Sequence, residues 1–339
     1  MSLRLAGLGW VTPLGSDLAG VWEKLCSGAE AEPTTVSSSL GRKKAYPVFA
    51  VPPAAIAEAA RYPRLRRASA ISRFAVVAGL AALRDAGIEL EEASAARTAL
   101  VFAISNGGVI YTKRFYHEIV QSGAAAASPL LFPETVFNAP ASHISAYLGS
   151  SAINYTLVGD EGTFLLGLAT GANWLAEGKV EACVVVASEE ADWLTAEAMG
   201  LFDRSKIASE GAGALILTPQ KTEVELLRIT DEFLYAKDGK TAALERMKKE
   251  LGEPGGETAL YDSTSGERGI SKEENRLWKD WKWPRIAPRR VLGEGLMAAT
   301  AWQCVAAADH IAHGGCGEAF ISCAGFHQHA IGAILGRAG

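Results

Sequence analysis

The sequence has few cysteines and no closely spaced pair of them. Its 339 residues include five cysteines, an odd number, and no two stand in a Cys-x-x-Cys spacing. Three of them lie in apolar runs, which is typical of reduced and mostly buried thiols. We therefore expect no disulfide framework and a cytoplasmic location.

Long apolar runs and an excess of basic residues are also missing. The longest apolar runs contain Gly, Asn or Asp and stay short of a membrane span. The first ten residues lack the apolar core of a signal peptide. A net charge of −5 and a pI near 5.8 disfavour nucleic acid or an anionic membrane as the main partner. We expect no membrane span and no nucleic-acid partner.

The sequence contains an internal repeat. One unit has Glu161, a helix over about 163–177 and a strand over 181–187; the other has Glu294, a helix over about 296–313 and a strand over 318–324. Both helices are apolar nearly all round, which predicts buried central helices. Both strands are almost continuous apolar runs, as in strands covered on both faces. The repeat predicts a duplicated α/β fold with halves at 1–218 and 219–339.

Each unit begins with a tight turn that presents one acidic side chain at a helix N-terminus. Gly159 and Gly162 flank Glu161, and we expect them to allow a strained backbone there. A helix N-terminus favours negative charge, so a thiolate in this place becomes reactive whereas a carboxylate is only stabilised. The first turn has the shape expected of a turn that presents a nucleophile, but the residue that it presents is Glu161.

Other segments complete the predicted fold. The sequence favours strands at 4–9, 98–104 and 211–217, a helix at 72–86, a charged helix at 237–251, and a surface helix and loop at 272–283. The last segment is rich in charge and Trp, which is compatible with an interface.

Five segments, in order, resemble motifs of the β-ketoacyl synthases of the thiolase-like superfamily. The segments are Ala6–Gly15 ("TGxGxVTPLG"), Arg73–Gly87 (the first long helix), Phe137–Ser145 ("NxPAGHVS"), Phe202–Arg204 ("PFDxxRDG") and Ser209–Leu217 ("GEGAGxLVLE"). This resemblance covers nearly the whole chain and implies the thiolase-like duplicated five-layer α-β-α-β-α fold. It also implies acyl carrier protein or an acyl thioester as a partner, and no cofactor.

The resemblance assigns the catalytic positions, and every one of them is substituted. The position of the nucleophilic cysteine, counted from Asn154-Tyr155, holds Glu161. The "HGTGT" motif matches Tyr261–Gly266 and places Asp262 at its histidine. In the "KSxxGHxxGAAG" motif, the lysine position holds Arg289 and the histidine position holds Glu294.

The closing glycine-rich motif of the family, "SFGFGGTN", is substituted too. Phe326 falls at its gating phenylalanine. His327 and His329 fall where small residues normally let substrate pass.

Condensation requires a thiolate to carry the acyl group and imidazoles to stabilise the developing anion, and three carboxylates supply neither. Decarboxylation by relatives with glutamine at the nucleophile needs the histidines as well. Three roles stay open for Glu161, Asp262 and Glu294. They form a structural network neutralised by Arg289 and another base, or one acid is a general acid or base, or a divalent metal binds them with His327.

We predict a non-condensing partner subunit, similar in role to the chain-length factors that pair with an active ketosynthase in fatty acid or polyketide biosynthesis. The alternatives are an enzyme with carboxylate-based chemistry on an acyl substrate, and a homodimeric scaffold for acyl carrier protein. In each case we expect a homodimer or heterodimer, with the strand Cys183–Ala187 at the interface.

Overall fold

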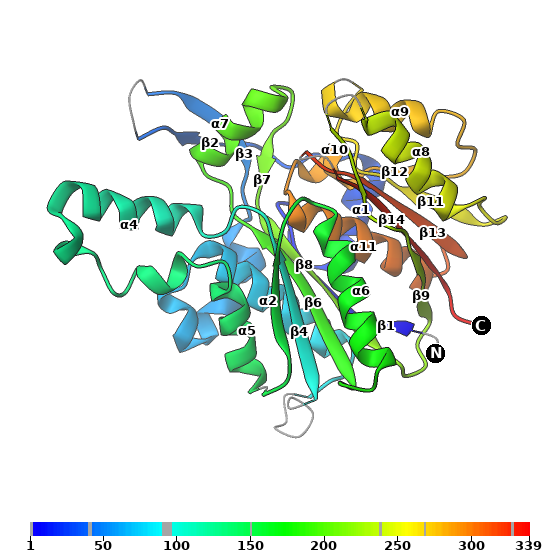
Figure 1. The fold of residues 1–339 in the computed structure, drawn as a ribbon, viewed down its shortest axis with the longest axis horizontal. Helices are drawn as coiled ribbons and strands as arrows, with labels where there is room; N and C mark the ends of the chain where they lie inside the picture. Colours follow the sequence, from blue (N-terminus) through cyan, green and yellow to red (C-terminus); the bar gives the residue numbers. More distant parts are fainter. Residues whose placement is uncertain are drawn as a thin grey trace.

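A large mixed sheet forms the centre of the molecule. The computed structural model describes residues 3–39, 43–89, 97–149, 151–236, 239–267, 269–326 and 329–339. Within them, eleven strands form one sheet, in the order β12-β11-β13-β14-β9-β1-β8-β6-β4-β5, with β10 paired to β14 (Figure 1). A second sheet of three strands has the order β2-β3-β7.

The strands have the following bounds. In the first half they are β1 Leu3–Val11, β2 Thr34–Ser37, β3 Ala45–Phe49, β4 Thr98–Ile104, β5 Asn154–Val158, β6 Ala182–Glu189, β7 Ala208–Ser209 and β8 Gly211–Thr218. In the second half they are β9 Val224–Ile229, β10 Phe233–Leu234, β11 Thr258–Tyr261, β12 Arg285–Ile286, β13 Glu318–Ala324 and β14 His329–Arg337.

The helices connect these strands and cover the sheet. They are α1 Leu18–Ser27, α2 Ala70–Asp85, α4 Val109–Ser122, α5 Ala139–Leu148, α6 Thr163–Ala176, α7 Trp193–Phe202, α8 Lys240–Leu251, α9 Lys272–Leu277, α10 Pro288–Leu292 and α11 Met297–Ala312. Short 3-10 turns lie at η1 Pro53–Arg61, η2 Pro63–Arg67, η3 Ala124–Ala126, η4 Phe132–Glu134 and η5 Gly269–Ser271.

The two halves of the sheet repeat one topology. The order β1-β8-β6-β4-β5 in the first half has the same form as β9-β14-β13-β11-β12 in the second. In both, the first three strands pair antiparallel and the last three parallel. An antiparallel β1–β9 pair joins them. The predicted duplication is therefore confirmed, while the division at residue 218 stays a prediction.

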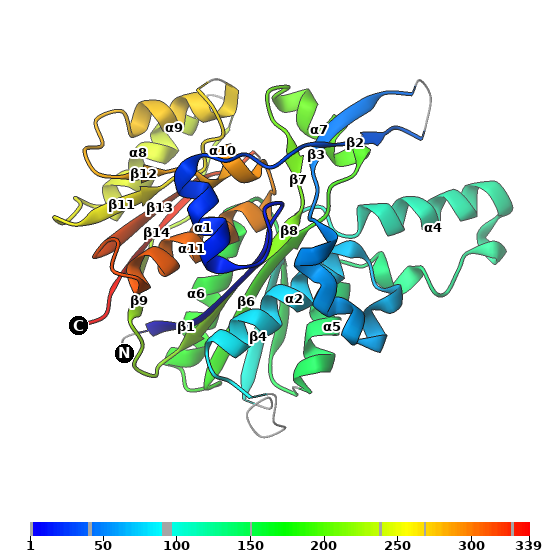
Figure 2. The same ribbon diagram turned by 180° about the vertical axis from the view of Figure 1, so that it is seen from behind.

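The helices α6 and α11 form the middle layer, as the repeat predicts. They contact each other, and each packs on strands of both halves (Figures 1 and 2). Helices α2 and α5 cover the outer face of the first half, and α8 with α9 covers the second. The thiolase-like α-β-α-β-α arrangement is confirmed.

Small residues let the middle layer approach the sheet. A Cβ on Gly171 of α6 would lie 2.7 Å from the sulfur of Cys183. A Cβ on Gly213 of β8 would lie 2.6 Å from the Cβ of Ala301. Cys183 is fully buried on β6, which pairs with β4 on one side and β8 on the other. The prediction that Cys183–Ala187 lies at a subunit interface is therefore wrong, because this strand is interior.

The Trp-rich segment is only partly a surface feature. Lys272–Leu277 is the short helix α9, but Trp278 is buried and its indole N–H donates to Ser322 Oγ at 3.0 Å. The charged helix α8 begins at Lys240; residues 237 and 238 of the predicted helix lie outside the described residues. None of the helices in the described part of the chain combines the length and apolarity needed to span a bilayer.

Candidate functional site

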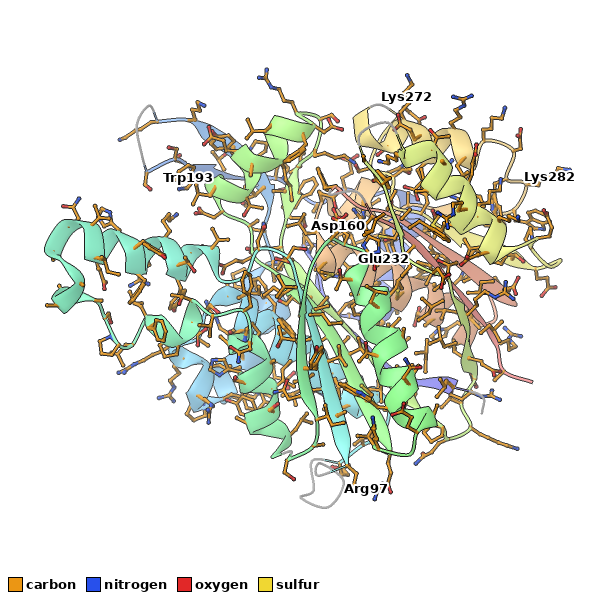
Figure 3. All side chains as sticks on the ribbon, viewed as in Figure 1. Arg97, Asp160, Trp193, Glu232, Lys272 and Lys282 are labelled. Atoms are coloured by element: carbon orange, nitrogen blue, oxygen red, sulfur yellow. The ribbon has the colours of Figure 1, made fainter. Side chains whose placement is uncertain are left out.

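Both acidic turns lie where the duplicated fold places them, directly before the two central helices. Glu161 follows β5 and precedes α6, while Glu294 follows α10 and precedes α11. Parallel strands β4, β5 and β6 end at this edge, which is where α/β sheets form their sites. Figure 3 labels Asp160 at this edge and Arg97 at the opposite one, before β4 begins.

The glycines of the first turn were expected to allow a strained backbone, and the structure shows a different reason for at least one of them. Neither Gly159 nor Gly162 has a positive φ. A Cβ on Gly162 would instead lie 2.5 Å from Ile331 and 2.7 Å from the ring of His329. The turn therefore needs glycine for space. Backbone strain lies in the second turn, where Leu296 has a φ of 49°.

Arg289 joins the two turns. Its Nη1 donates to Glu294 Oε1 at 2.6 Å and lies 3.9 Å from Glu161 Oε1. Its Nη2 donates to Thr300 Oγ1 at 3.2 Å. Glu161, Glu294 and Arg289 have relative exposures of 0%, 1% and 2%. These three predicted residues therefore form one buried ion cluster, in which a single guanidinium faces two carboxylates.

Lys206 supplies the second positive charge, and sequence reasoning missed it. Its Nζ lies 3.8 Å from Glu294 Oε2, and its side chain is 3% exposed. The signal was present in the sequence, because Lys206 occupies the basic position of the "PFDxxRDG" motif that begins at Phe202 and Asp203. It places a second basic side chain beside Glu294, in addition to Arg289.

A backbone donor also holds Glu161. Its Oε2 accepts a hydrogen bond of 2.9 Å from the backbone N–H of Phe326. Burial, followed by the neighbouring Asp160 carboxyl, raises the pKa of Glu161 to about 8, although Arg289 opposes this shift. Burial also raises the pKa of Glu294, against the lowering effect of Arg289 and Lys206. At neutral pH the turn therefore holds a protonated Glu161 carboxyl group more readily than an ordinary glutamate site does.

Asp262 has its own hydrogen-bond and ion-pair partners. Its carboxylate is paired with Arg285 of β12 and accepts from Thr264 N at 2.8 Å and Thr264 Oγ1 at 2.5 Å. In the described part of the chain it makes no hydrogen bond or ion pair with Arg289. Its link to the cluster is electrostatic. Burial, followed by Asp262, raises the pKa of Glu274, and Glu274 is among the groups that raise the pKa of Arg289 against the lowering effect of burial.

Two further predicted residues, Phe326 and His329, lie beside the first turn. Phe326 packs edge-on against Phe202, with ring centroids 6.2 Å apart. His329 is buried, with Nε2 3.2 Å from Glu232 Oε1. His327 lies outside the described residues. Among the residues that the structure does describe, no group of three or more His, Cys, Asp or Glu side chains is arranged to hold a metal ion.

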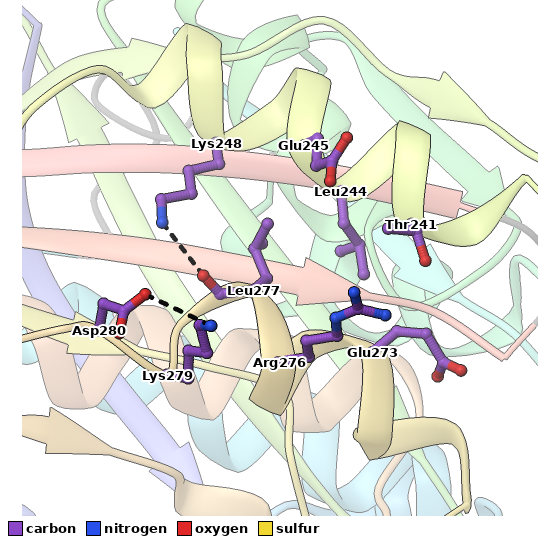
Figure 4. Close-up of a pocket in the computed structure, with 9 residues that line it drawn as sticks. All are labelled: Thr241, Leu244, Glu245, Lys248, Glu273, Arg276, Leu277, Lys279 and Asp280. Atoms are coloured by element: carbon purple, nitrogen blue, oxygen red, sulfur yellow. Dashed lines mark hydrogen bonds and ion pairs between the residues drawn. The ribbon is translucent and has the colours of Figure 1, made fainter.

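A pocket of about 310 Å³ lies elsewhere, between α8 and α9 (Figure 4). Its charged residues are mixed in sign: Glu245, Lys248, Glu273, Arg276, Lys279 and Asp280. Lys248 Nζ donates to the Leu277 carbonyl at 3.1 Å, which ties the two helices together. No residue that lines this pocket belongs to the buried ion cluster.

Comparison of the sequence with known proteins identifies the family of the chain. Residues 4–215 match the model of the β-ketoacyl synthase N-terminal domain. The chain is 25% identical over 190 residues to the 3-oxoacyl-[acyl-carrier-protein] synthase 2 of Coxiella burnetii, covering 55% of this chain and 45% of that protein. It is 24% identical over 195 residues to the protein of the same name from Vibrio harveyi, with the same coverage. The match thus spans less than half the length of these curated relatives.

Solved structures share the fold over the whole chain. The ishigamide ketosynthase/chain length factor superimposes with a TM-score of 0.83 at 18% identity, covering 100% of both chains. A structure of the ketosynthase ApeO in complex with its chain length factor ApeC, from Xenorhabdus doucetiae, matches with a TM-score of 0.76 at 16% identity, covering 99% of this chain and 98% of that one. The family match over residues 4–215, together with this shared architecture, shows that the chain belongs to the β-ketoacyl synthase family.

Proposed function

We propose that the protein is a non-condensing member of its family that acts as the partner subunit of a catalytic ketosynthase, as chain-length factors do. The observation that carries the proposal is the hydrogen bond from the Phe326 backbone N–H to Glu161 Oε2. A backbone N–H beside a nucleophile stabilises the oxyanion of an acyl transfer. Here that donor is used by a carboxyl group of the protein itself.

The ion cluster supports a fixed structural role for the acids. Arg289 and Lys206 neutralise Glu294, and Arg289 also faces Glu161. Breaking the close Arg289–Glu294 pair is strongly destabilising, because one buried charge is left without compensation. Residues held in this way keep the turn closed and are poorly suited to move an acyl group.

A large exposed apolar region supports an association with a second subunit. Helix α4 projects from the body of the molecule and has no buried residue (Figure 1). A groove of about 880 Å³ lies along it, lined by Tyr116, Val120, Phe137 and Leu194 among others. The strand β5 lies at the edge of the sheet in the described part of the chain, with Tyr155 and Val158 exposed. An unpaired strand edge beside apolar side chains favours pairing with another chain.

An arginine cluster supports acyl carrier protein, an acidic protein, as a second partner. Arg61, Arg64, Arg66 and Arg67 are exposed within η1 and η2, in a chain whose net charge is −5. In the described part of the chain none of the four forms an ion pair, since the neighbouring Glu58 is bound to Arg84. Tyr111 Oη donates to the Arg67 carbonyl at 3.0 Å, which places the cluster at the base of α4.

Co-expression with a Cys-His-His ketosynthase of the same organism tests the partner proposal. We expect a one-to-one heterodimer by light scattering, weakened by Val158→Lys on the β5 edge and by Val120→Lys in the groove along α4. A chain that stays monomeric with and without that ketosynthase would refute the proposal. For the second partner, Arg66→Glu should weaken binding of acyl carrier protein, whereas Lys221→Glu, an equal charge change at another exposed position, should not.

The raised pKa of Glu161 favours one alternative, carboxylate-based chemistry. A carboxyl group whose pKa is about 8 is able to donate a proton near neutral pH. This alternative requires the buried Glu161 to become accessible to substrate. Turnover of an acyl thioester that is abolished by Glu161→Gln would support it over the structural role.

A further inference from the structure

A second polar cluster adjoins the ion cluster through the ammonium group of Lys206. Its Nζ donates to Ser265 Oγ and, at 3.1 Å, to Ser271 Oγ. Both serines belong to the segment that follows β11 and Asp262. A buried lysine bonded to a serine hydroxyl is the arrangement found in Ser–Lys hydrolases, where the amine takes the hydroxyl proton.

Only one of the three serines in this segment is placed to react. Ser263 is buried, with its hydroxyl 2.5 Å from Glu274 Oε2. Ser271 is also buried, and its hydroxyl accepts from Lys206 and from Ser265 N at 3.2 Å. Ser265 is half-buried, and within the described part of the chain its hydroxyl bonds to Lys206 alone. Ser265 is therefore the serine that a substrate can reach.

The residue after Ser265 leaves room for a substrate. A Cβ on Gly266 would have no heavy atom within 4 Å. Asn275 Nδ2 donates to the Gly266 carbonyl at 2.7 Å and holds the loop. The backbone N–H after a nucleophilic serine is a common oxyanion donor in serine hydrolases. Gly266 thus supplies both open space and a donor position.

The surroundings of Lys206 suit it to act as a base. Burial has the largest effect on its pKa and lowers it, which outweighs the raising effect of Glu294. Glu294 has a closer cation in Arg289, at 2.6 Å compared with 3.8 Å for Lys206. A lysine with a lowered pKa has the neutral amine available at lower pH than an exposed lysine has.

We propose that Ser265 and Lys206 form a nucleophile–base pair that hydrolyses an acyl thioester. Ser265 Oγ attacks the thioester carbonyl while its proton passes to Lys206 Nζ. The C–S bond then breaks, the thiolate takes that proton, and an acyl ester remains on Ser265. Water attacks the ester, gives a proton to Lys206, and Ser265 Oγ leaves and is reprotonated, so the products are a thiol and a carboxylic acid. The choice of a thioester as substrate rests on the proposed function. The assignment of the nucleophile–base pair rests on the contacts of Lys206 and Ser265 and is independent of that function.

A fluorophosphonate probe tests the pair directly, because it reacts with activated serines. Intact-mass measurement and peptide mapping of the full chain should show one adduct, on Ser265. Labelling should be absent in Ser265→Ala. In Lys206→Arg, which keeps the positive charge and the hydrogen bonds but removes the base, the labelling rate should fall by about 100-fold or more.

The matched control is Ser205→Ala, an exposed serine next to Lys206 whose hydroxyl is held by Asp203 at 2.6 Å. The Ser205→Ala variant should be labelled at the wild-type rate. For the wild type, the labelling rate should rise with pH as Lys206 loses its proton. No adduct on Ser265 would overturn the pair, as would equal labelling of wild type and Lys206→Arg. If the variants fail to fold, the position of the wild-type adduct still decides the question.

A second assay separates the substrate class from the pair. Short acyl-coenzyme A thioesters and p-nitrophenyl esters are offered to the wild type and to Ser265→Ala. Thioester hydrolysis that is lost in Ser265→Ala supports the proposal, and cleavage of the esters alone overturns the thioester assignment. Heterodimer formation is measured on the same proteins by light scattering. Loss of Ser265 should leave it unchanged, so a failure of the partner proposal is seen independently.

Discussion

The backbone N–H of Phe326 donates a hydrogen bond of 2.9 Å to Oε2 of Glu161, a residue 165 positions earlier in the chain. This contact joins the loop after β13 to the turn before α6. Because Glu161 is fully buried and its other oxygen lies 3.9 Å from Arg289, the carboxyl group is held between a backbone donor and a guanidinium. An acyl oxygen could accept a hydrogen bond from the Phe326 N–H only after displacing the Glu161 carboxyl group.

The substitution Glu161→Gln should stabilise the protein at neutral and alkaline pH. The folded-state pKa of Glu161 is about 8, above its usual value of 4.5, so the folded state binds a proton that the unfolded state loses. Stability therefore falls as pH rises from about 4.5 to 8, by roughly a few kcal/mol in total. Gln keeps an acceptor for Phe326 without an ionisable proton. Thermal melts from pH 5 to 9 should show a flatter curve for this variant.

The control for that measurement is Glu177→Gln, an exposed glutamate at the C-terminal end of α6. It should keep the wild-type pH dependence. Part of the decline will remain in Glu161→Gln, because burial also raises the pKa of Glu189 to about 8 and that of Glu190 to about 7. A wild type whose melting temperature rises between pH 5 and 8 would contradict this account.

Replacing Arg289 by Met should destabilise the fold strongly. The change leaves Glu294 and Glu161 buried without their shared cation, which costs about 3–5 kcal/mol in comparable buried pairs. The neighbouring Arg290 forms an exposed pair with Glu267, and such pairs contribute about 0–1 kcal/mol. Denaturant unfolding of Arg289→Met and Arg290→Met should therefore differ clearly. Equal losses in the two variants would show that the ion cluster has no special role.

The sequence predicted the fold better than it predicted the contacts of the site. The strand 98–104 and the helix beginning at Thr163 were predictable, because apolar periodicity follows from burial and is local. The duplication was predictable from the repeated turn-helix-strand unit. The proximity of Glu161, Arg289 and Glu294 depends on contacts between distant segments, which no local pattern specifies. It could be predicted only from the positions of these residues in the motifs of the family.

Three features of the site were beyond such reasoning. The pairing of Asp262 with Arg285 depends on the parallel pairing of β11 and β12, which no local pattern specifies. The interior position of Cys183 depends on strand order, and an apolar run is equally compatible with a core strand and an interface. The space requirement of Gly162 arises from Ile331 and His329, which lie in the other half of the chain.

Gly325→Ala should test how tightly the loop before Phe326 packs on the acidic turn. A Cβ on Gly325 would lie 1.9 Å from Asp160 Oδ2 and 2.6 Å from Glu161 Oε2, so both carboxyl groups would have to move. Overpacking of this kind costs about 1–3 kcal/mol. The control is Gly256→Ala, where a Cβ would have no neighbour within 4 Å. Matching melting temperatures for the two variants would mean that the loop is free to shift away from Glu161.

Restoring a thiol at the turn should not restore condensation. In Glu161→Cys the new side chain stands before α6, where the N-terminus of the helix favours a thiolate. The remaining positions still supply no imidazole, since Glu294 is bound to Arg289 and Asp262 to Arg285. Incubation with acyl and malonyl thioesters should therefore yield ketoacyl product no faster than the wild type does, as measured by mass spectrometry. Iodoacetamide adducts mapped to the peptide of this turn, and so distinguished from those on the exposed Cys26, serve as the control that the new thiol is present and reactive. The opposite outcome is ketoacyl product from Glu161→Cys that is lost on alkylation and is not formed by the wild type. It would show that carboxylates at the other two positions are compatible with condensation. The physical basis for a non-condensing role would then be removed.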